Sequence, residues 1–421
     1  MAMLWEGINP QIGPRLPMSV TCRVSICILS CFAFALPARA EGLADAILGG
    51  GWWLDLRTRT ERVDQDNLPR NASAHTLRSR AGYATGVYEG LSSLIEFEHM
   101  FHLGTERFNN GNEPASPYPL VPDPDTAELN QAALRYDGPW GATVVLGRQR
   151  IVHDNERYIG DAGFRQNMQT FDAVSLISRA LPRTEIRYEY IDRANRIFGR
   201  ESSLGDWEME GHAASAAWLG WAAGKLTGYG YFFDIDERPD LSSRTFGARW
   251  DAKAAPIGGW KPAYVLEAAI QSDYGRRQDS FDESYFLIQP SLAKGPVTVT
   301  AGYEVLGGNG RNAFTTPLAT LHKFQGFTDV LDIPPPGGVR DLMAEINYQS
   351  AHIQPFDVIR IWGGAHHFSA DDGGGEYGRE YYAALGVTFR GVYGEIKAAS
   401  YGADGFGADT QKLWFSLAKK I

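Results

Sequence analysis

The chain has 421 residues with 40 basic and 50 acidic side chains, a formal net charge of −10, and 44% apolar and 12% aromatic residues. This composition is too apolar for a disordered chain, and the negative charge argues against a nucleic-acid binder, which needs a basic face for phosphate. Past residue 40, no apolar run approaches the roughly 20 residues of a membrane-spanning helix. A helical membrane protein is therefore excluded, whereas a β-barrel stays open because its strands alternate.

The amino-terminal segment has the pattern of an export signal. Arg23 precedes an apolar run over residues 24–36, and an Ala-Arg-Ala cleavage site follows that run. All three cysteines lie in this segment, so the mature chain needs no disulfide or thiolate chemistry; a lipid-modified Cys31 is the alternative to simple cleavage. We therefore expect a signal peptide with an upstream extension at residues 1–40 and one exported domain at residues 41–421.

Apolar and polar side chains alternate with a period of two through the rest of the chain, and helical periodicity is hard to find. Over residues 185–190, Ile, Tyr and Tyr alternate with Glu, Arg and Glu, and residues 342–348 repeat the pattern. Alternation of this kind is typical of a β-strand with one apolar and one wet face. The predicted strands lie near residues 52–63, 73–86, 88–103, 127–137, 141–149, 170–180, 183–193, 207–221, 224–235, 242–252, 262–272, 284–294, 296–306, 340–350, 355–367, 378–389, 392–401 and 410–420.

The connections between these predicted strands alternate in length. Those after even-numbered strands are mostly short, as at residues 138–140 and 390–391, whereas those after odd-numbered strands are mostly long, as at residues 104–126, 150–169 and 307–339. Outer-membrane barrels have this rhythm because their external loops are long and their periplasmic turns are tight. The sequence therefore predicts an all-β fold, a transmembrane antiparallel β-barrel of about 18 strands in the outer membrane of a Gram-negative cell.

Aromatic side chains gather near the ends of the predicted strands. Membrane barrels carry aromatic girdles at both interfaces, although a large soluble core is the alternative use for such residues. The aromatics concerned are Trp52, Trp53, Tyr136, Trp140, Trp218, Trp221, Trp250, Trp260, Trp362, Tyr381, Tyr382 and Trp414.

Residues 147–172 form the most unusual stretch, because they combine four arginines with carboxylates and amides on a long connection. A guanidinium group presents a planar fork of donors that suits carboxylates. In a barrel this connection could fold into the lumen and narrow it, whereas on a solvated loop the same residues would pair with one another. The candidate solute-pathway residues here are Arg148, Arg150, Asp154, Asn155, Glu156, Arg157, Arg165, Gln166 and Asn167.

Strand alternation places further arginines on the polar face of the predicted sheet. A charge on the lipid face costs a few kcal/mol at mid-membrane, so these arginines should face a water-filled lumen. Salt bridging within the barrel wall is the alternative role, and both roles can coexist. The candidate pathway residues are Arg57, Arg59, Arg80, Arg187 and Arg360, and Arg78, Arg135 and Arg249 share the same pattern.

The arginine-rich stretch also resembles a known family. Gly-Arg-Gln-Arg at residues 147–150, Asp-Asn-Glu-Arg-Tyr-Ile-Gly at 154–160 and the segment 164–172 look like the signature of the alginate-export porins, and residues 316–327 match a second stretch. The resemblance implies an eighteen-stranded barrel whose Arg- and Lys-lined lumen passes an anionic polysaccharide, alginate or a related polyuronate, by passive diffusion. It also implies outer-membrane lipid and a periplasmic export scaffold as partners. Successive guanidinium groups would then offer weak sites that bind and release successive carboxylates.

Two other functions stay open, namely a general or organic-anion-selective uptake porin and a secreted carbohydrate-active enzyme. Asp154 and Glu156 could form a carboxylate pair for glycoside hydrolysis, but carboxylates so close in one loop are more typical of salt bridges. His366 and His367 are adjacent in a predicted strand and should point to opposite faces, which argues against a shared metal site. We therefore expect no enzyme activity, no catalytic residue, no metal, no cofactor and no nucleic-acid partner, and we expect a monomer.

Overall fold

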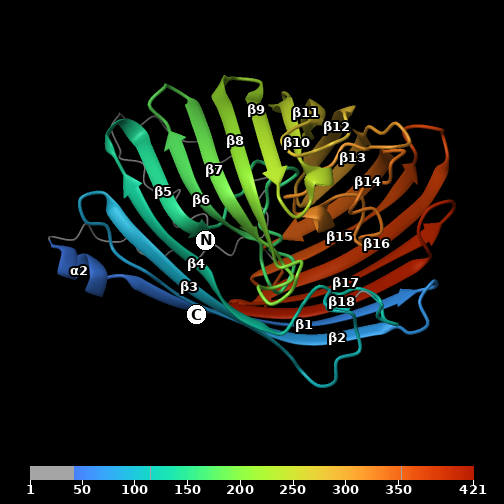
Figure 1. The fold of residues 1–421 in the computed structure, drawn as a ribbon, viewed down its shortest axis with the longest axis horizontal. Coiled ribbons are helices and arrows are strands. Elements are labelled where there is room, and N and C mark those ends of the chain that lie inside the picture. The colour runs from blue at the N-terminus through green and yellow to red at the C-terminus, as the bar shows by residue number, and fades with distance from the viewer. Residues whose placement is uncertain (1–41, 114, 352) are drawn as a thin grey trace.

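The computed structural model describes residues 42–113, 115–351 and 353–421, so the predicted signal peptide at 1–40 lies outside the described residues. A short helix, α2, precedes eighteen strands that form one antiparallel sheet (Figure 1). Within these ranges, no helix is long and apolar enough to cross a membrane. The elements are α2 (Leu43–Leu48), β1 (Gly51–Gln65), β2 (Ala72–Ala84), β3 (Leu91–His102), β4 (Thr126–Asp137), β5 (Ala142–Gln149), β6 (Thr170–Ser178), β7 (Thr184–Asn195), β8 (Asp206–Trp221), β9 (Gly224–Ile235), β10 (Ser243–Lys253), β11 (Lys261–Asp273), β12 (Asp282–Lys294), β13 (Val297–Leu306), β14 (Val339–Ser350), β15 (Val358–Ser369), β16 (Glu376–Phe389), β17 (Val392–Ala403) and β18 (Thr410–Lys420), with short 3-10 turns at Pro139–Gly141, Pro239–Leu241 and Leu321–Lys323.

The sheet closes on itself because β1 pairs with β2 on one side and with β18 on the other. In Figure 1 the blue β1 and the red β18 lie side by side, although they come from opposite ends of the chain. Closure gives the backbone N–H and C=O groups of the strands partners within the sheet, which a bilayer could not supply. The predicted all-β barrel is confirmed, and β9 and β18 have their predicted bounds.

The two ends of the barrel differ in their connections. One end, which we call the turn end, holds the first residue of β1, the last residue of β18 and the short connections such as residues 390–391. The opposite end, the loop end, holds the long connections, including residues 150–169 and 307–338. In outer-membrane barrels the tight turns face the periplasm and the long loops face outward.

The outer face of the barrel is apolar. Leu385, Ile396 and Phe415 lie next to one another on β16, β17 and β18, and 42%, 50% and 43% of their surfaces are exposed. Burying such a surface is favourable, and lipid hydrocarbon is the medium that covers the outside of a closed barrel. The barrel is therefore a membrane-spanning one rather than the fold of a secreted soluble enzyme.

The predicted aromatic girdle is present only in part. Trp52, Trp140 and Trp218 are exposed at the turn end, where a membrane-interface belt would place them. Trp53 and Trp414, in contrast, are buried on the lumen face, because successive side chains of a strand point to opposite faces. The aromatics noted from the sequence therefore divide between the lipid surface and the lumen.

A charge in the middle of the outer face should destabilise the barrel. Ile396→Arg places a guanidinium near the centre of β17, so we expect the free energy of unfolding to fall by about 2–4 kcal/mol. Gln411→Arg, at the loop end of β18, is the matched control and should cost about 1 kcal/mol or less. Urea titration of the barrel refolded into phospholipid vesicles measures both. Equal losses for the two variants would contradict the membrane position assigned to this face.

Candidate functional site

Two long segments from the loop end, residues 150–169 and 307–338, meet inside the barrel. Ile159 and Leu318 form a parallel bridge, and the backbone N–H of Gly160 donates to the Leu318 carbonyl at 2.9 Å. Side chains from both segments belong to one buried apolar cluster with residues of the wall strands. The two segments therefore cross the lumen as one unit and narrow it, as predicted for the first of them.

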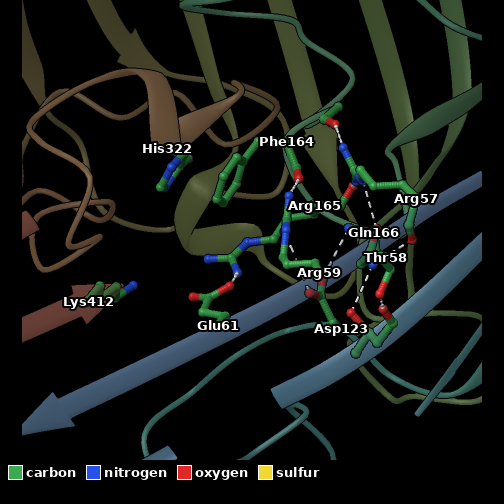
Figure 2. Close-up of polar contacts among 12 residues, drawn as sticks. Arg57, Thr58, Arg59, Glu61, Asp123, Phe164, Arg165, Gln166, His322 and Lys412 are labelled. Atoms are coloured by element: carbon green, nitrogen blue, oxygen red, sulfur yellow. Dashed lines mark hydrogen bonds and ion pairs between the residues drawn. The ribbon is translucent and has the colours of Figure 1, made fainter. Parts of the chain in front are cut away.

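Arginines of β1 and β2 hold the first segment. Arg57 donates from Nε to the side-chain carbonyl of Gln166 at 2.7 Å and from Nη1 to the Gly163 carbonyl at 3.0 Å, and Arg59 donates to the Phe164 carbonyl (Figure 2). Arg80 donates from Nη2 to the Gln166 carbonyl at 3.2 Å. Alternation explains this arrangement, because residues two apart on a strand share one face. We call Arg57, Arg59 and Arg80 the clamp.

Carboxylates balance the charges of the clamp and of the neighbouring Arg78. Asp123 Oδ2 lies 3.6 Å from Arg59 Nη1, and its Oδ1 accepts the backbone N–H of Gln166 at 3.1 Å. Glu98 pairs with Arg80, and Asp55 with Arg78 at 2.6 Å from Nη2. Buried charges of this kind stay only where partners compensate their lost hydration.

A second charged cluster joins both inner segments to β1 and β18. Arg165 lies between two carboxylates, with Nη1 at 3.2 Å from Glu61 Oε2 and Nη2 at 2.9 Å from Asp329 Oδ2. Lys412 Nζ reaches the same oxygen of Asp329 at 2.6 Å. Figure 2 shows Arg165, Glu61 and Lys412 converging on this part of the lumen.

His322 extends this cluster to β17. Its Nδ1 lies 2.5 Å from Asp329 Oδ1, and its Nε2 lies 2.7 Å from Lys397 Nζ. An ammonium group only donates, so Nε2 accepts and Nδ1–H donates to the carboxylate. The imidazole also stacks on Phe164, with ring centroids 3.5 Å apart, which ties the second segment to the first.

Burial and neighbouring charges shift the pKa values in this cluster. Burial lowers the pKa of His322 well below its ordinary value, and Lys397 and Arg165 add to the effect against the attraction of Asp329. Burial alone would raise the pKa of Asp329, but His322, Lys412 and Arg165 outweigh it and hold that pKa well below the usual range. At neutral pH the imidazole is therefore neutral and the carboxylate ionised.

Other predicted residues of the first segment are held by ion pairs. Arg157 is buried, with Nε at 3.1 Å from Glu304 Oε1 and its guanidinium 4.5 Å from the Phe324 ring centroid. Asp154 pairs with Lys225, and Glu156 with Lys323 at 2.7 Å; the Oδ1 of Asn155 accepts the backbone N–H of Arg157 at 3.3 Å. These residues thus brace the segment.

A cavity of about 490 Å³ lies in the turn-end half of the lumen, between the wall strands β3–β9 and residues 149–154. Leu94, Ala133, Val145 and Ile177 supply apolar lining on one side. The charged lining comprises Arg135, Arg150, Arg179, Arg187 and Lys225 against Asp154, Glu185 and Glu189, with His153 beside Glu189 at 3.2 Å. Five cations face three carboxylates, so the lining itself has a basic surplus, and two of the cations, Arg135 and Arg150, also pair with Asp137 and Asp161 outside the lining.

The remaining predicted residues lie in different places. Arg150 and Arg187 line the cavity, and Arg360 is on the lumen face of β15, with its guanidinium 4.2 Å from the Trp362 ring. Asn167 is fully buried beside the clamp. Arg148 shares the outer face with its partner Asp172, at 2.7 Å from Nε, because neighbouring Gln149 faces the lumen. Arg148 is therefore left out of the pathway that we propose.

Several residues that shape the lumen were not predicted from the sequence. Lys225 alternates in step with the lumen-facing residues of β9, so the same period-two pattern could have found it. Alternation also places Lys397 on the lumen face of β17, but its cluster with His322 and Asp329 has no local signal, because the three residues come together only when the second segment enters the barrel.

No protein-family model and no curated protein matches the chain. Solved structures do match: Pseudomonas aeruginosa OpdK with vanillate has a TM-score of 0.68 at 15% identity, over 89% of this chain and 99% of that one. Acinetobacter baumannii OccAB1 has a TM-score of 0.71 at 12% identity, over 91% and 99%, and Pseudomonas aeruginosa OccK9 (OpdG) has 0.69 at 14%, over 89% and 99%. Another matching structure is that of the outer membrane protein OpdK from Pseudomonas aeruginosa. The chain has the fold of these barrels, and its place is the outer membrane.

The predicted membership of the alginate-export family is wrong. The matching barrels named above are OpdK, OccK9 and OccAB1, and no family model supports the motif resemblance at residues 147–172 and 316–327. In this structure the charged and amide residues of the first stretch brace a segment inside the lumen, as Arg157 does with Glu304 and Arg165 with Glu61, so the motif was a weaker guide than its length suggested. A polysaccharide cargo and a periplasmic scaffold lose their support with it.

Removing the carboxylate of Asp329 should loosen the second segment. Asp329→Asn leaves Lys412 and His322 without their anionic partner in a buried place, so we expect docking of residues 307–338 to lose about 3–5 kcal/mol. Trypsin cleavage after Lys323 in the folded, detergent-solubilised barrel measures the undocked fraction. Asp240→Asn, which breaks an exposed ion pair with Arg238 outside the two inner segments, is the matched control and should leave cleavage unchanged. Equal cleavage of the two variants would contradict the cluster's role.

Acid should weaken docking through the same cluster. His322 has a lowered pKa in the docked state, so the undocked state binds more protons and docking loses stability as pH falls below the ordinary value of about 6.5. Asp329 also has a lowered pKa, and its contribution is lost on further acidification below about 3.9. Current fluctuations in planar bilayers should grow from pH 7.5 to pH 5. His322→Gln removes the first titration, and a variant that kept the wild-type profile would rule out His322 as the titrating group.

Proposed function

We propose that the protein is an outer-membrane porin that admits small organic anions by passive diffusion. The observation that carries the proposal is the cavity of about 490 Å³ with its basic surplus, which lies within a lumen narrowed by two docked segments. The volume falls within the range of sites for small molecules. Since the wall bears five cations and three carboxylates, it attracts an anionic solute without holding it by an unscreened charge.

The cavity's lining also suits an anion with an apolar body. Leu94, Val145 and Ile177 offer apolar surface, and Arg187 and Lys225 lie on the charged side. A carboxylate attached to a ring or a short chain could place its two parts on these two sides. The solved structure of OpdK with vanillate, an aromatic carboxylate, supports this choice of solute class.

The wall contains the partly neutralised cations that a passive route needs. Arg187 is paired with Glu185 at 2.6 Å from Nε, and Lys225 with Asp154, so each cation is already partly neutralised. Partial neutralisation keeps solute binding shallow, and shallow sites release their ligand quickly. We propose that a single barrel is the working unit, because the apolar outer face of the closed sheet can lie against lipid on all sides.

Anion preference in planar bilayers tests the proposal. In a potassium chloride gradient, wild-type channels should have a reversal potential closer to the equilibrium potential of chloride than to that of potassium. Benzoate or vanillate should reduce the chloride current because it occupies the cavity. Uncharged arabinose at the same concentration is the matched control and should leave the current unchanged. A cation-selective channel, or one that carboxylates do not block, would overturn the proposed function.

A further inference from the structure

We infer that Arg57, Arg59 and Arg80 position the segment 150–169 and do not bind the solute, whose route follows the other wall past Arg187 and Lys225. This inference rests on the proposed function. It divides the lumen arginines into a clamp, which sets the shape and size of the passage, and a selectivity wall, which sets the preference for anions.

The clamp engages consecutive backbone carbonyls. The carbonyl oxygens of residues 163, 164, 165 and 166 each accept a hydrogen bond from Arg57, Arg59 or Arg80. Arg57 uses all three of its donor nitrogens on the segment, counting Nε to Gln166. A planar guanidinium fork can hold two carbonyls at once in a fixed geometry, which an ammonium cannot. The arrangement therefore fixes the backbone of residues 163–166, which have no regular secondary structure, in one position.

Burial separates Arg59 and Arg80 from the selectivity wall. Arg57 is half-buried, and it is set apart by its hydrogen bonds, because all three of its donor nitrogens are used on the segment. The side chains of Arg59 and Arg80 are 3% and 10% exposed, whereas those of Arg187 and Lys225 are 22% and 31% exposed. A solute carboxylate can share a partly exposed cation, but it could reach Arg59 only by displacing the Phe164 carbonyl and the ring that stacks on the guanidinium at 4.2 Å. The buried arginines thus act on the solute only through the position of the segment.

Both groups contain positive charges on the lumen face, so a neutralising substitution alone would not separate them. Lysine does, because it keeps the charge and loses the fork. Arg57→Lys/Arg59→Lys should therefore release the segment at constant lumen charge. Arg179→Gln/Arg187→Gln should change the lumen charge with the segment still docked, because both cavity-lining arginines pair with Glu185 of the wall. Lys225 is left unchanged because it pairs with Asp154 of the segment. Arg62→Lys, on the exposed outer face of β1, is the matched control.

Two measurements on the full-length barrel read the two roles apart. For the lysine pair we expect trypsin to cleave within residues 150–169 at least about tenfold faster, since the loss of one charged hydrogen bond shifts docking by that factor. Its conductance should rise and fluctuate while the reversal potential stays near the wild-type value. For the glutamine pair we expect the anion-to-cation permeability ratio to fall about threefold or more, with trypsin resistance unchanged.

Wild-type cleavage and conductance in the lysine pair would overturn the inference. So would a shift in reversal potential for Arg57→Gln/Arg59→Gln, at unchanged conductance, as large as that of the glutamine pair on the wall. If the double substitutions prevent folding, Gln166→Leu removes one clamp partner from the segment alone and should show the same cleavage. A wild-type channel without anion preference would refute the proposed function, while the cleavage and conductance results would still decide the role of the clamp.

Discussion

Backbone hydrogen bonding in lipid is the constraint on which this structure depends. A strand in hydrocarbon must pair on both sides, and the only arrangement that leaves no edge is a closed sheet. The pairing of β1 with β18 supplies the closure, and it fixes two faces with opposite requirements. The outer face must be apolar along every strand, whereas the inner face encloses water and must satisfy every charge placed there. The remaining features of the molecule follow from how the inner face meets that second requirement.

The charges of the inner face are satisfied partly by the backbone of two segments that enter the lumen. Loops in a protein interior carry N–H and C=O groups that need partners, and a wall of arginines and carboxylates is a source of such partners. The segments at 150–169 and 307–338 accept donors from the wall strands and return their own charges to it, as Arg165 does to Glu61. The lumen is therefore narrowed by a folded insert that is held by ion pairs as well as by an apolar cluster, and the ion pairs explain why its stability should respond to pH.

The strands could be predicted from the sequence because period-two alternation is local and each lipid-facing strand must obey it. Even the face of Lys225 was within reach of that rule. The inner cluster was not, because its members are far apart in the chain: 75 residues separate Lys397 from His322, and 109 separate Arg57 from Gln166. The wrong assignment of Arg148 has a different origin, because local alternation turns it outward beside Asp172 although its sequence neighbours look like pathway residues. The residues of the motif that suggested alginate export hold a segment inside the lumen, and they do not identify a transported solute.

Residue type alone thus says little about what a lumen arginine does. A guanidinium whose donors end on backbone carbonyls behaves as a structural cross-link, and its charge is compensated by carboxylates such as Asp123. One that lines open space, such as Arg187, keeps part of its surface for a passing ion although it has a partner. Because the two kinds of arginine occupy different positions on the inner face, substitutions can change the width of the passage and its charge separately. Selectivity for solute size and for solute charge can then vary independently on a single scaffold.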